Sequence, residues 1–290
     1  MTDKDTFFKP KLILNVGGRI IDLAEPKVMG IVNLTPDSFY EGSRMQSGRE
    51  VLATAEKMLA DGADFLDLGA YSTRPGAEEI SADEESERLL PAIRKLSKEF
   101  PQAILSVDTF RANIAERAID SGAHIINDIS GGTLDDKMFE TIGKLKVPYI
   151  LMHLKGNPKT MNQLNQYENL AQEIVSHLSE RVAQLKAFGV KDIIVDPGFG
   201  FAKNIDQNYQ LLNQMQRLKI LGLPILAGLS RKSMIWKTLG ITAGEALNGT
   251  TVLNAIALQN GASILRVHDV KEAKECIRIF KKLKENEQEF

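Results

Sequence analysis

Short apolar runs alternate along this chain with longer stretches in which apolar residues recur at helical spacing. The short runs are apolar almost throughout, a pattern typical of strands that are buried on both faces of a parallel sheet. They occupy residues 28–34, 64–69, 104–108, 124–129, 148–153, 192–196, 224–229 and 263–267. Eight such strands in 290 residues predict an α/β fold, a single (β/α)8 TIM barrel. An open doubly wound sheet is the competing arrangement, but it usually contains fewer strands.

The stretches between the runs carry helix signals. Ser81 is followed three residues later by Glu84, which is the spacing of a capping box at a helix N-terminus. Pro91 falls inside the helical pattern that follows, so we expect a kink or two short helices there. Residues 167–189 form a long periodic stretch that ends at a glycine, and a final helix is expected over residues 271–284.

A small hairpin is predicted before the first barrel strand. Residues 11–16 and 19–23 flank Gly17-Gly18, which is a two-residue turn signal. We expect this hairpin to plug the floor of the barrel. No linker or low-complexity segment interrupts the chain, so one domain is predicted over residues 1–290, with its core at residues 26–284.

Composition limits the classes of partner. The formal net charge is −2, so no overall field favours nucleic acid or an anionic membrane. A single cysteine, Cys276, rules out an intrachain disulfide and fits a reducing compartment. Residues 1–10 lack the apolar core of a signal peptide, and no apolar run is long enough to span a bilayer. We therefore expect a cytoplasmic protein with small-molecule partners, and with neither nucleic acid nor membrane among them.

Polar residues gather at the carboxyl ends of the predicted strands, where a (β/α)8 barrel carries its chemistry. For any single residue, capping of a helix or closing of a turn is the simpler explanation. At all eight strand ends together that explanation is weak, and a functional barrel mouth is favoured. The residues are Asn33, Asp67, Asp108, Asn127, Asp128, His153, Asp196, Arg231, Lys232, Arg266 and His268.

The types of these side chains indicate the chemistry of a ligand. Asp108, Asn127 and Asp196 supply acceptors that suit a planar heterocycle with a guanidine-like edge. Lys232 could meet a carbonyl or a ring nitrogen of the same molecule. Residues 199–201, Phe-Gly-Phe, offer a flat apolar surface on which a ring can stack.

Further residues suggest an anion site and lids. Arg266 and His268 are two apart in one predicted strand and point to the same face, where they suit a phosphate-bearing group. Residues 230–233 precede a predicted helix whose first N–H groups could hold a carboxylate, although a serine N-cap is the alternative. The polar loops at residues 35–42 and 71–77 could act as lids, with a self-packed surface loop as the alternative.

Taken together, these segments resemble the dihydropteroate synthase family of pterin-binding enzymes. The motifs occur in family order over nearly the whole chain, and all of them in register are very specific. They are residues 29–39 (MGIVNLTPDSF), 72–77 (STRPGA), 106–109 (SVDT), 124–128 (HIIND), 151–153 (LMH), 156–161 (GNPKTM), 196–201 (DPGFGF), 230–233 (SRKS) and 266–269 (RVHD). The resemblance also implies a (β/α)8 fold, in agreement with the strand count.

The resemblance implies a transferase of folate biosynthesis. It would condense 6-hydroxymethyl-7,8-dihydropterin diphosphate with p-aminobenzoate, giving 7,8-dihydropteroate and diphosphate, with Mg2+ as cofactor. The family also implies a sulfonamide target and a homodimer.

The resemblance assigns roles to residues at the barrel mouth. Pterin binding would fall to Asp108, Asn127, Met152, Asp196, Phe201, Gly228, Lys232 and Arg266, of which Asp108, Asp196, Lys232 and Arg266 would be catalytic. Diphosphate would be bound by Asn33, Arg266 and His268, with Asn33 also binding the metal. The p-aminobenzoate pocket would be formed by Phe39, Thr73, Arg74, Pro75 and Ser233.

Three short segments depart from the family's usual sequence. Residues 40–43 read Tyr-Glu-Gly-Ser where members often carry Ser-Asp-Gly-Gly, and residues 70–71 are Ala-Tyr where many carry Gly-Glu. Residues 202–203 are Ala-Lys where Gly-Lys is common. These changes concern the geometry of the lids and the response to inhibitors, not the reaction class.

Other functions stay open at this point. A methyltransferase on the same barrel, using methyltetrahydrofolate and a corrinoid partner, would share the acids but would not need the two loops or the Arg266/His268 pair. A non-catalytic paralogue would be expected to lose a lid motif or that pair. A barrel acting on a sugar phosphate would explain the cations but not the acids. In the last two predicted helices, Leu253, Ile256 and Ile277 fit either a core or an interface.

Overall fold

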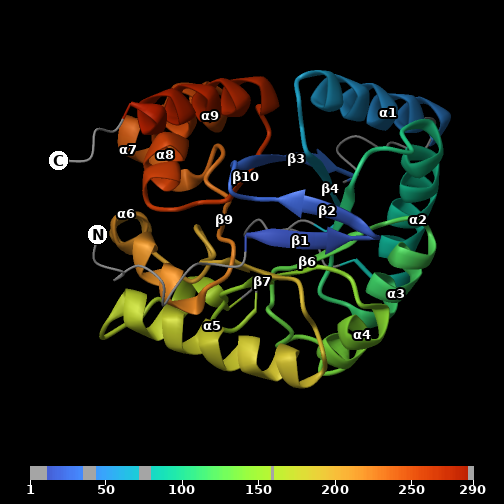
Figure 1. Ribbon diagram of the computed structural model, residues 1–290, viewed down its shortest axis with the longest axis horizontal. Coiled ribbons are helices and arrows are strands. Elements are labelled where there is room, and N and C mark those ends of the chain that lie inside the picture. The colour runs from blue at the N-terminus through green and yellow to red at the C-terminus, as the bar shows by residue number, and fades with distance from the viewer. Residues whose placement is uncertain (1–11, 35–43, 72–79, 158–159, 287–290) are drawn as a thin grey trace.

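A computed structural model describes residues 12–34, 44–71, 80–157 and 160–286. Within these ranges eight parallel strands form one sheet, in the order β8-β7-β6-β5-β4-β3-β10-β9. A parallel bridge between Val195 and Ile225 joins the two outer strands, so the sheet closes into a barrel. Figure 1 looks along this barrel and shows the helices arranged around it. The predicted TIM barrel is confirmed.

Each barrel strand lies on one of the eight predicted runs. The strands are β3 (Lys27–Asn33), β4 (Phe65–Gly69), β5 (Leu105–Asp108), β6 (Ile125–Asp128), β7 (Tyr149–Met152), β8 (Ile193–Asp196), β9 (Leu226–Ala227) and β10 (Ile264–Val267). The α-helices of the described ranges are α1 (Arg44–Ala60), α2 (Ala82–Glu99), α3 (Ala112–Asp120), α4 (Met138–Leu145), α5 (Leu170–Ala187), α6 (Ile205–Gln214), α7 (Ser233–Leu239), α8 (Leu247–Gln259) and α9 (Val270–Glu285). Among these helices, none is long and apolar enough to cross a membrane.

The helix α2 corrects one expectation. Its N-cap is Ser81, whose hydroxyl accepts a hydrogen bond from the Glu84 N–H at 3.1 Å, as predicted. However, the helix continues through Pro91 as one element, so the predicted division into two short helices is wrong. Pro91 and Glu87, whose carbonyl loses its usual donor, are both exposed, so water can satisfy that carbonyl.

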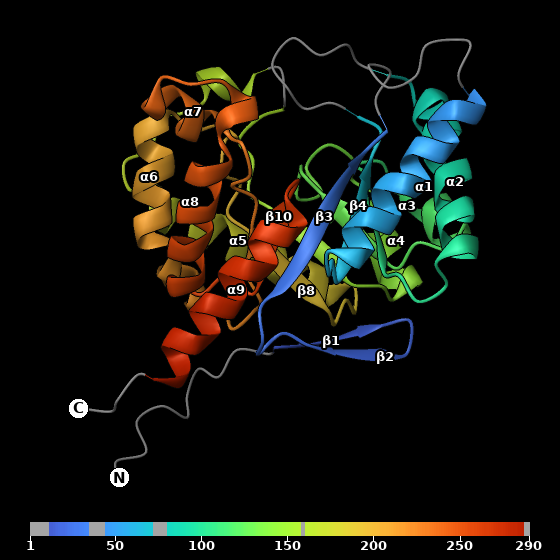
Figure 2. The same ribbon diagram turned by 90° about the horizontal axis from the view of Figure 1, so that it is seen from above.

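The hairpin closes the barrel floor, as predicted. Its strands are β1 (Ile13–Val16) and β2 (Arg19–Asp22), and both turn glycines between them have positive φ. Figure 2 shows the hairpin lying across one end of the barrel. Three buried hairpin residues pack against the first inward-facing layer of the strands. The hairpin residues are Leu14, Val16 and Leu23, and the layer is Met29, Phe65, Ile104, Ile125, Ile150, Ile194, Leu226 and Ile264.

The hairpin plug should contribute to stability through its buried side chains. Leu14 is 1% exposed, whereas its neighbour Ile13 is 49% exposed. We expect Leu14→Ala to lower the free energy of unfolding by about 2–5 kcal/mol, because it leaves a cavity under the barrel. The matched change Ile13→Ala should cost less than about 0.5 kcal/mol. Equal losses for the two variants in urea unfolding would show that the hairpin does not plug the core.

Strand alternation places the functional residues. Because successive side chains point to opposite faces, the residues two positions beyond the apolar floor form the next inward layer. That layer is Ile31, Asp67, Ser106, Asn127, Met152, Asp196, Gly228 and Arg266. It contains four of the polar residues that the sequence singles out, Asp67, Asn127, Asp196 and Arg266, and it lies toward the carboxyl ends of the strands.

Candidate active site

The centre of the candidate site is an arginine held by two carboxylates. Arg266, on β10, donates through Nε to Asp67 Oδ2 at 2.6 Å and through Nη2 to Asp108 Oδ2 at 2.8 Å. The side chain of Asp67 is fully buried, and those of Asp108 and Arg266 are only 16% and 21% exposed. Asp108 and Arg266 therefore meet, as predicted.

Asp67 is a residue to which the sequence assigned no role. Its Oδ2 also accepts a hydrogen bond from the Asn127 amide at 3.0 Å, so it links Arg266 to Asn127. Its other oxygen, Oδ1, has no hydrogen-bond partner among the described residues. A carboxylate within an apolar strand is costly to bury unless it is paired, and that cost is the signal that could have identified it.

The three charges affect one another. Burial raises the pKa of Asp108 to about 7, although Arg266 opposes the shift. Burial also opposes the charge of Arg266, but Asp67 and Asp108 together raise its pKa above the ordinary value. The cluster thus keeps a fixed cation, and Asp108 can change its charge near neutral pH.

A second part of the site is built by the loop after β8. Asp196, at the end of that strand, is 7% exposed and accepts a hydrogen bond from the Gly198 N–H at 2.7 Å. The ammonium of Lys232 donates to the Phe199 carbonyl and lies 4.5 Å from the centroid of the Phe201 ring. Burial lowers the pKa of Lys232 to about 8, with the Asp196 carboxylate opposing the shift.

Two apolar positions leave room for a flat ring. Met152 is 3% exposed and belongs to a small apolar cluster against which Phe201 packs. At Gly228, an added Cβ would meet no heavy atom within 4 Å, so the space beside this backbone is open. The predicted pterin-binding residues therefore include both an apolar wall, Met152 and Phe201, and the open space beside Gly228.

The remaining predicted residues lie on the rim. Asn33 is exposed at the end of β3 and pairs in register with Gly69, which in turn pairs with Asp108. His268 directly follows β10, and its Nδ1 lies 3.0 Å from the Ser230 hydroxyl. Ser233 is the first residue of α7, whose N-cap is Lys232, so the serine N-cap alternative does not hold.

The predicted Arg266/His268 pair differs from expectation in one respect. The prediction was a cationic pair that binds a phosphate group, but Arg266 already donates to the carboxylates of Asp67 and Asp108, which balance its charge. Its third nitrogen, Nη1, makes no hydrogen bond that is found among the described residues.

Several predictions fall on residues outside the described ranges. Phe39, Thr73, Arg74 and Pro75 lie there, as do most residues of the two proposed lids and the departure at residues 40–43. Of the departures that are described, Tyr71 packs edge-on against Phe110, with ring centroids 5.2 Å apart.

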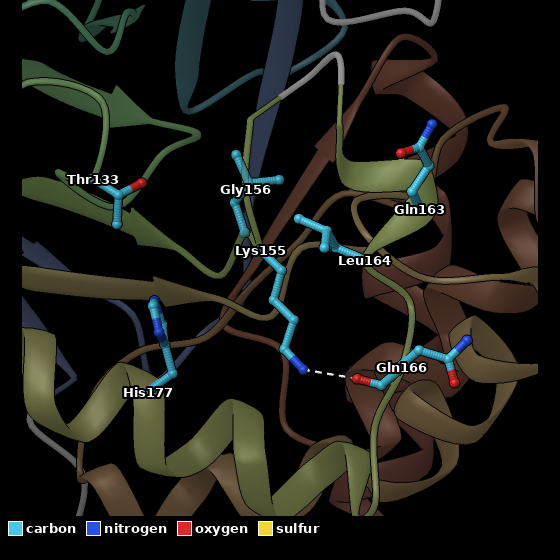
Figure 3. A pocket seen from close by; sticks show the side chains of 8 residues that line it. Thr133, Lys155, Gly156, Gln163, Leu164, Gln166 and His177 are labelled. Atoms are coloured by element: carbon cyan, nitrogen blue, oxygen red, sulfur yellow. Dashed lines mark hydrogen bonds between the residues drawn. The ribbon is translucent and has the colours of Figure 1, made fainter.

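A separate cavity of about 580 Å³ lies beside α5, outside this constellation. Figure 3 shows its lining, which includes Lys155 and His177 and none of the predicted site residues. The ammonium of Lys155 donates to the Gln166 carbonyl at 2.9 Å and is therefore already engaged. Within the described residues, no group of three or more His, Cys, Asp or Glu side chains could by itself hold a metal ion.

Comparison with known proteins agrees with this geometry. The profile of the pterin binding enzyme family matches residues 29–268. The dihydropteroate synthase of Synechocystis sp. is 42% identical over 277 residues, which cover 94% of this chain and 95% of that protein.

Solved structures give the same picture. The Yersinia pestis dihydropteroate synthase in a sulfonamide drug complex matches with a TM-score of 0.88 at 38% identity, covering 94% of this chain and 99% of that chain. The Xanthomonas albilineans dihydropteroate synthase in complex with 7,8-dihydropteroate matches with a TM-score of 0.84 at 33% identity, covering 94% and 98%. The chain therefore belongs to the dihydropteroate synthase family of pterin binding enzymes.

Proposed function

We propose that this protein condenses 6-hydroxymethyl-7,8-dihydropterin diphosphate with p-aminobenzoate, giving 7,8-dihydropteroate and diphosphate. The observation that carries the proposal is the grouping of Asp67, Asp108 and Asn127 around Arg266 at the barrel mouth. The 7,8-dihydropteroate complex of a relative with the same fold supports it. The acids also favour this reaction over a barrel that acts on a sugar phosphate.

The pterin ring is recognised by its hydrogen-bonding edge and its faces. Asp108, Asn127 and Asp196 accept hydrogen bonds from the amino group and ring N–H groups, while Lys232 donates to the ring carbonyl or a ring nitrogen. The apolar contacts come from Met152, Phe201 and the open space beside Gly228, with Arg266 over the ring.

The chemical step separates charge, and this chain's residues stabilise both halves. The bond between the exocyclic methylene and the diphosphate oxygen breaks, and its electron pair leaves with the diphosphate. The positive charge left on the methylene and ring is stabilised by Asp108 and Asp196. Arg266 and His268 hold the departing diphosphate. The neutral amine of p-aminobenzoate then forms the new C–N bond and loses a proton, so no covalent enzyme nucleophile is needed.

The residues present fit a Mg2+ ion that arrives with the substrate. The amide oxygen of Asn33 is a hard ligand, is exposed, and lies on the rim next to the strands that carry Asp67 and Asp108. Mg2+ typically takes one or two protein oxygens and completes its shell with phosphate and water. When bound, the ion would neutralise charge on the leaving diphosphate.

The second substrate would be held above the pterin. Ser233, at the start of α7, would receive the carboxylate of p-aminobenzoate, and Phe39, Thr73, Arg74 and Pro75 would complete the pocket from the lids. Because the lids would close over the diphosphate first, we propose ordered binding with the pterin first.

A direct assay tests the reaction. The protein is incubated with the pterin diphosphate and Mg2+, with and without p-aminobenzoate, and the release of diphosphate is followed. The proposal requires release that depends on p-aminobenzoate and an equal amount of dihydropteroate. A folded protein that releases diphosphate at the same rate without the amine, or not at all, would not have this function.

The shifted pKa values of Asp108 and Lys232 predict a narrow pH optimum for the reaction. Asp108 must be ionised to stabilise the cation, so kcat/KM for the pterin diphosphate should fall as the pH drops through about 7. Lys232 must be protonated to donate, so kcat/KM should also fall as the pH rises through about 8. In Lys232→Arg the charge persists at high pH, so the alkaline limb should move upward. An unchanged alkaline limb in that variant would assign it to another group.

We also propose a homodimer formed through α8, in the cytoplasm. Val252 and Ile256 are exposed one turn apart on this helix, whereas Leu253 and Ile277 are buried in the core. In light scattering, the wild type should have twice the 32.1 kDa chain mass. Ile256→Glu should give a monomer, while Ile220→Glu, at another exposed apolar residue, should not. A monomeric wild type would exclude the dimer.

A further inference from the structure

The loop after β8 has an unusual backbone. Gly198, Gly200 and Ala202 have φ of 73°, 80° and 50°, so alternate residues adopt the left-handed conformation. A Cβ on Gly198 would lie 2.2 Å from the carbonyl oxygen of His153, which leaves no room for a larger residue. A left-handed alanine is strained by comparison with glycine, so side-chain contacts must help to hold this shape.

Lys203, near the end of the same loop, supplies such contacts. Its ammonium donates to the carbonyls of Gly198 at 3.0 Å and Phe201 at 2.9 Å. The third acceptor is Nδ1 of His153, at 3.1 Å. An ammonium has three N–H donors, and the three contacts of Lys203 use all of them. Burial lowers the pKa of His153 well below its ordinary value, which keeps its ring neutral and able to accept.

The other side of the same loop faces the candidate site. The Phe199 carbonyl, between the two clamped carbonyls, accepts from Lys232, and the Phe201 ring lies 4.5 Å from that ammonium. The Gly198 N–H donates to Asp196. Three predicted pterin-binding residues therefore depend on the shape of a loop that Lys203 fixes.

We propose that Lys203 is a positioning residue for the pterin site. It holds the loop after β8 so that Phe201, Lys232 and Asp196 keep the geometry that binds the ring, and it acts through the loop and not on the reacting atoms. The inference rests on the proposed function and deepens it. Burial lowers the pKa of Lys203 to about 7, and the Asp196 carboxylate opposes that shift.

The test is a kinetic comparison of the two substrates. Lys203→Met keeps the length of the side chain but removes all three donors. We expect the KM for the pterin diphosphate to rise at least about tenfold, because several charge-assisted hydrogen bonds are lost. The KM for p-aminobenzoate should stay within about threefold, since this loop does not form the proposed p-aminobenzoate pocket. A pterin KM within twofold of wild type, or equal rises for both substrates, would overturn the role.

Two further variants keep the test decisive. His153→Phe removes one acceptor and leaves both carbonyl contacts, so a rise in pterin KM of about threefold is expected even if Lys203→Met does not fold. No rise in folded His153→Phe would also contradict the role. Lys274→Met is the matched control, because Lys274 also pairs with a carboxylate, Asp64 at 2.7 Å, but it does so from α9 at the floor end of the barrel. A wild type that makes no dihydropteroate would instead overturn the proposed function itself.

Discussion

We expect Asp196→Ala to abolish measurable binding of the pterin diphosphate, which means that its Kd rises at least about 100-fold. The change removes the carboxylate that accepts from the ring, and it leaves the buried Lys232 ammonium without its opposing charge. Titration calorimetry with Mg2+ and without p-aminobenzoate measures this directly. Lys232→Ala should have the same effect, because the pterin ring then loses a hydrogen-bond donor. The Phe201 ring also loses the ammonium that lies over it.

The strand that carries Asp196 also offers a control. Asp192 precedes β8 at its opposite end, toward the barrel floor. Asp192→Ala should leave the Kd within about threefold, since it lies away from the strand ends that form the site. If Asp196→Ala and Lys232→Ala folded and still bound the pterin diphosphate within about tenfold of wild type, the assignment of these residues would be wrong.

The second large effect concerns Asp67. Asp67→Asn keeps the shape of the side chain but removes the negative charge paired with Arg266 at 2.6 Å. We expect kcat/KM to fall at least about 100-fold, because Arg266 loses the negative charge that orients it. Steady-state kinetics and circular dichroism together separate this loss from unfolding.

A matched change tests whether position matters. Asp64, which pairs with Lys274 at 2.7 Å, lies just before β4 and three residues before Asp67. Asp64→Asn also removes a paired carboxylate, but at the floor end of the barrel, so kcat/KM should stay within about twofold. Similar losses of kcat/KM in the two variants would mean that the effect of Asp67 is general destabilisation.

The sequence predicted the barrel well because its signals are local. Each buried strand is an apolar run, and the Gly17-Gly18 turn specifies the hairpin without information from elsewhere. The strand-end residues Asp108, Asn127 and Arg266 could also be predicted to meet, because the barrel brings the ends of all strands to one mouth.

The contacts within the site could not be predicted in the same way. Asp67 meets Asn127 and Arg266 across 60 and 199 positions of sequence, and periodicity carries no information about such pairs. The role of Lys203 depends on left-handed backbone at Gly198 and Ala202, and at an alanine no residue type announces that conformation. The predicted division of the helix at Pro91 was wrong because the rule for proline ignores solvent on an exposed face.

The most direct test of the account is a crystal structure with the oxidised, unreactive pterin diphosphate and Mg2+. The account predicts the ring between Phe201 and Arg266, its polar edge on Asp108, Asn127 and Asp196, and the diphosphate beside His268 and Asn33. A ligand bound in the cavity beside α5, or a pterin that contacts none of the three acceptors, would contradict it.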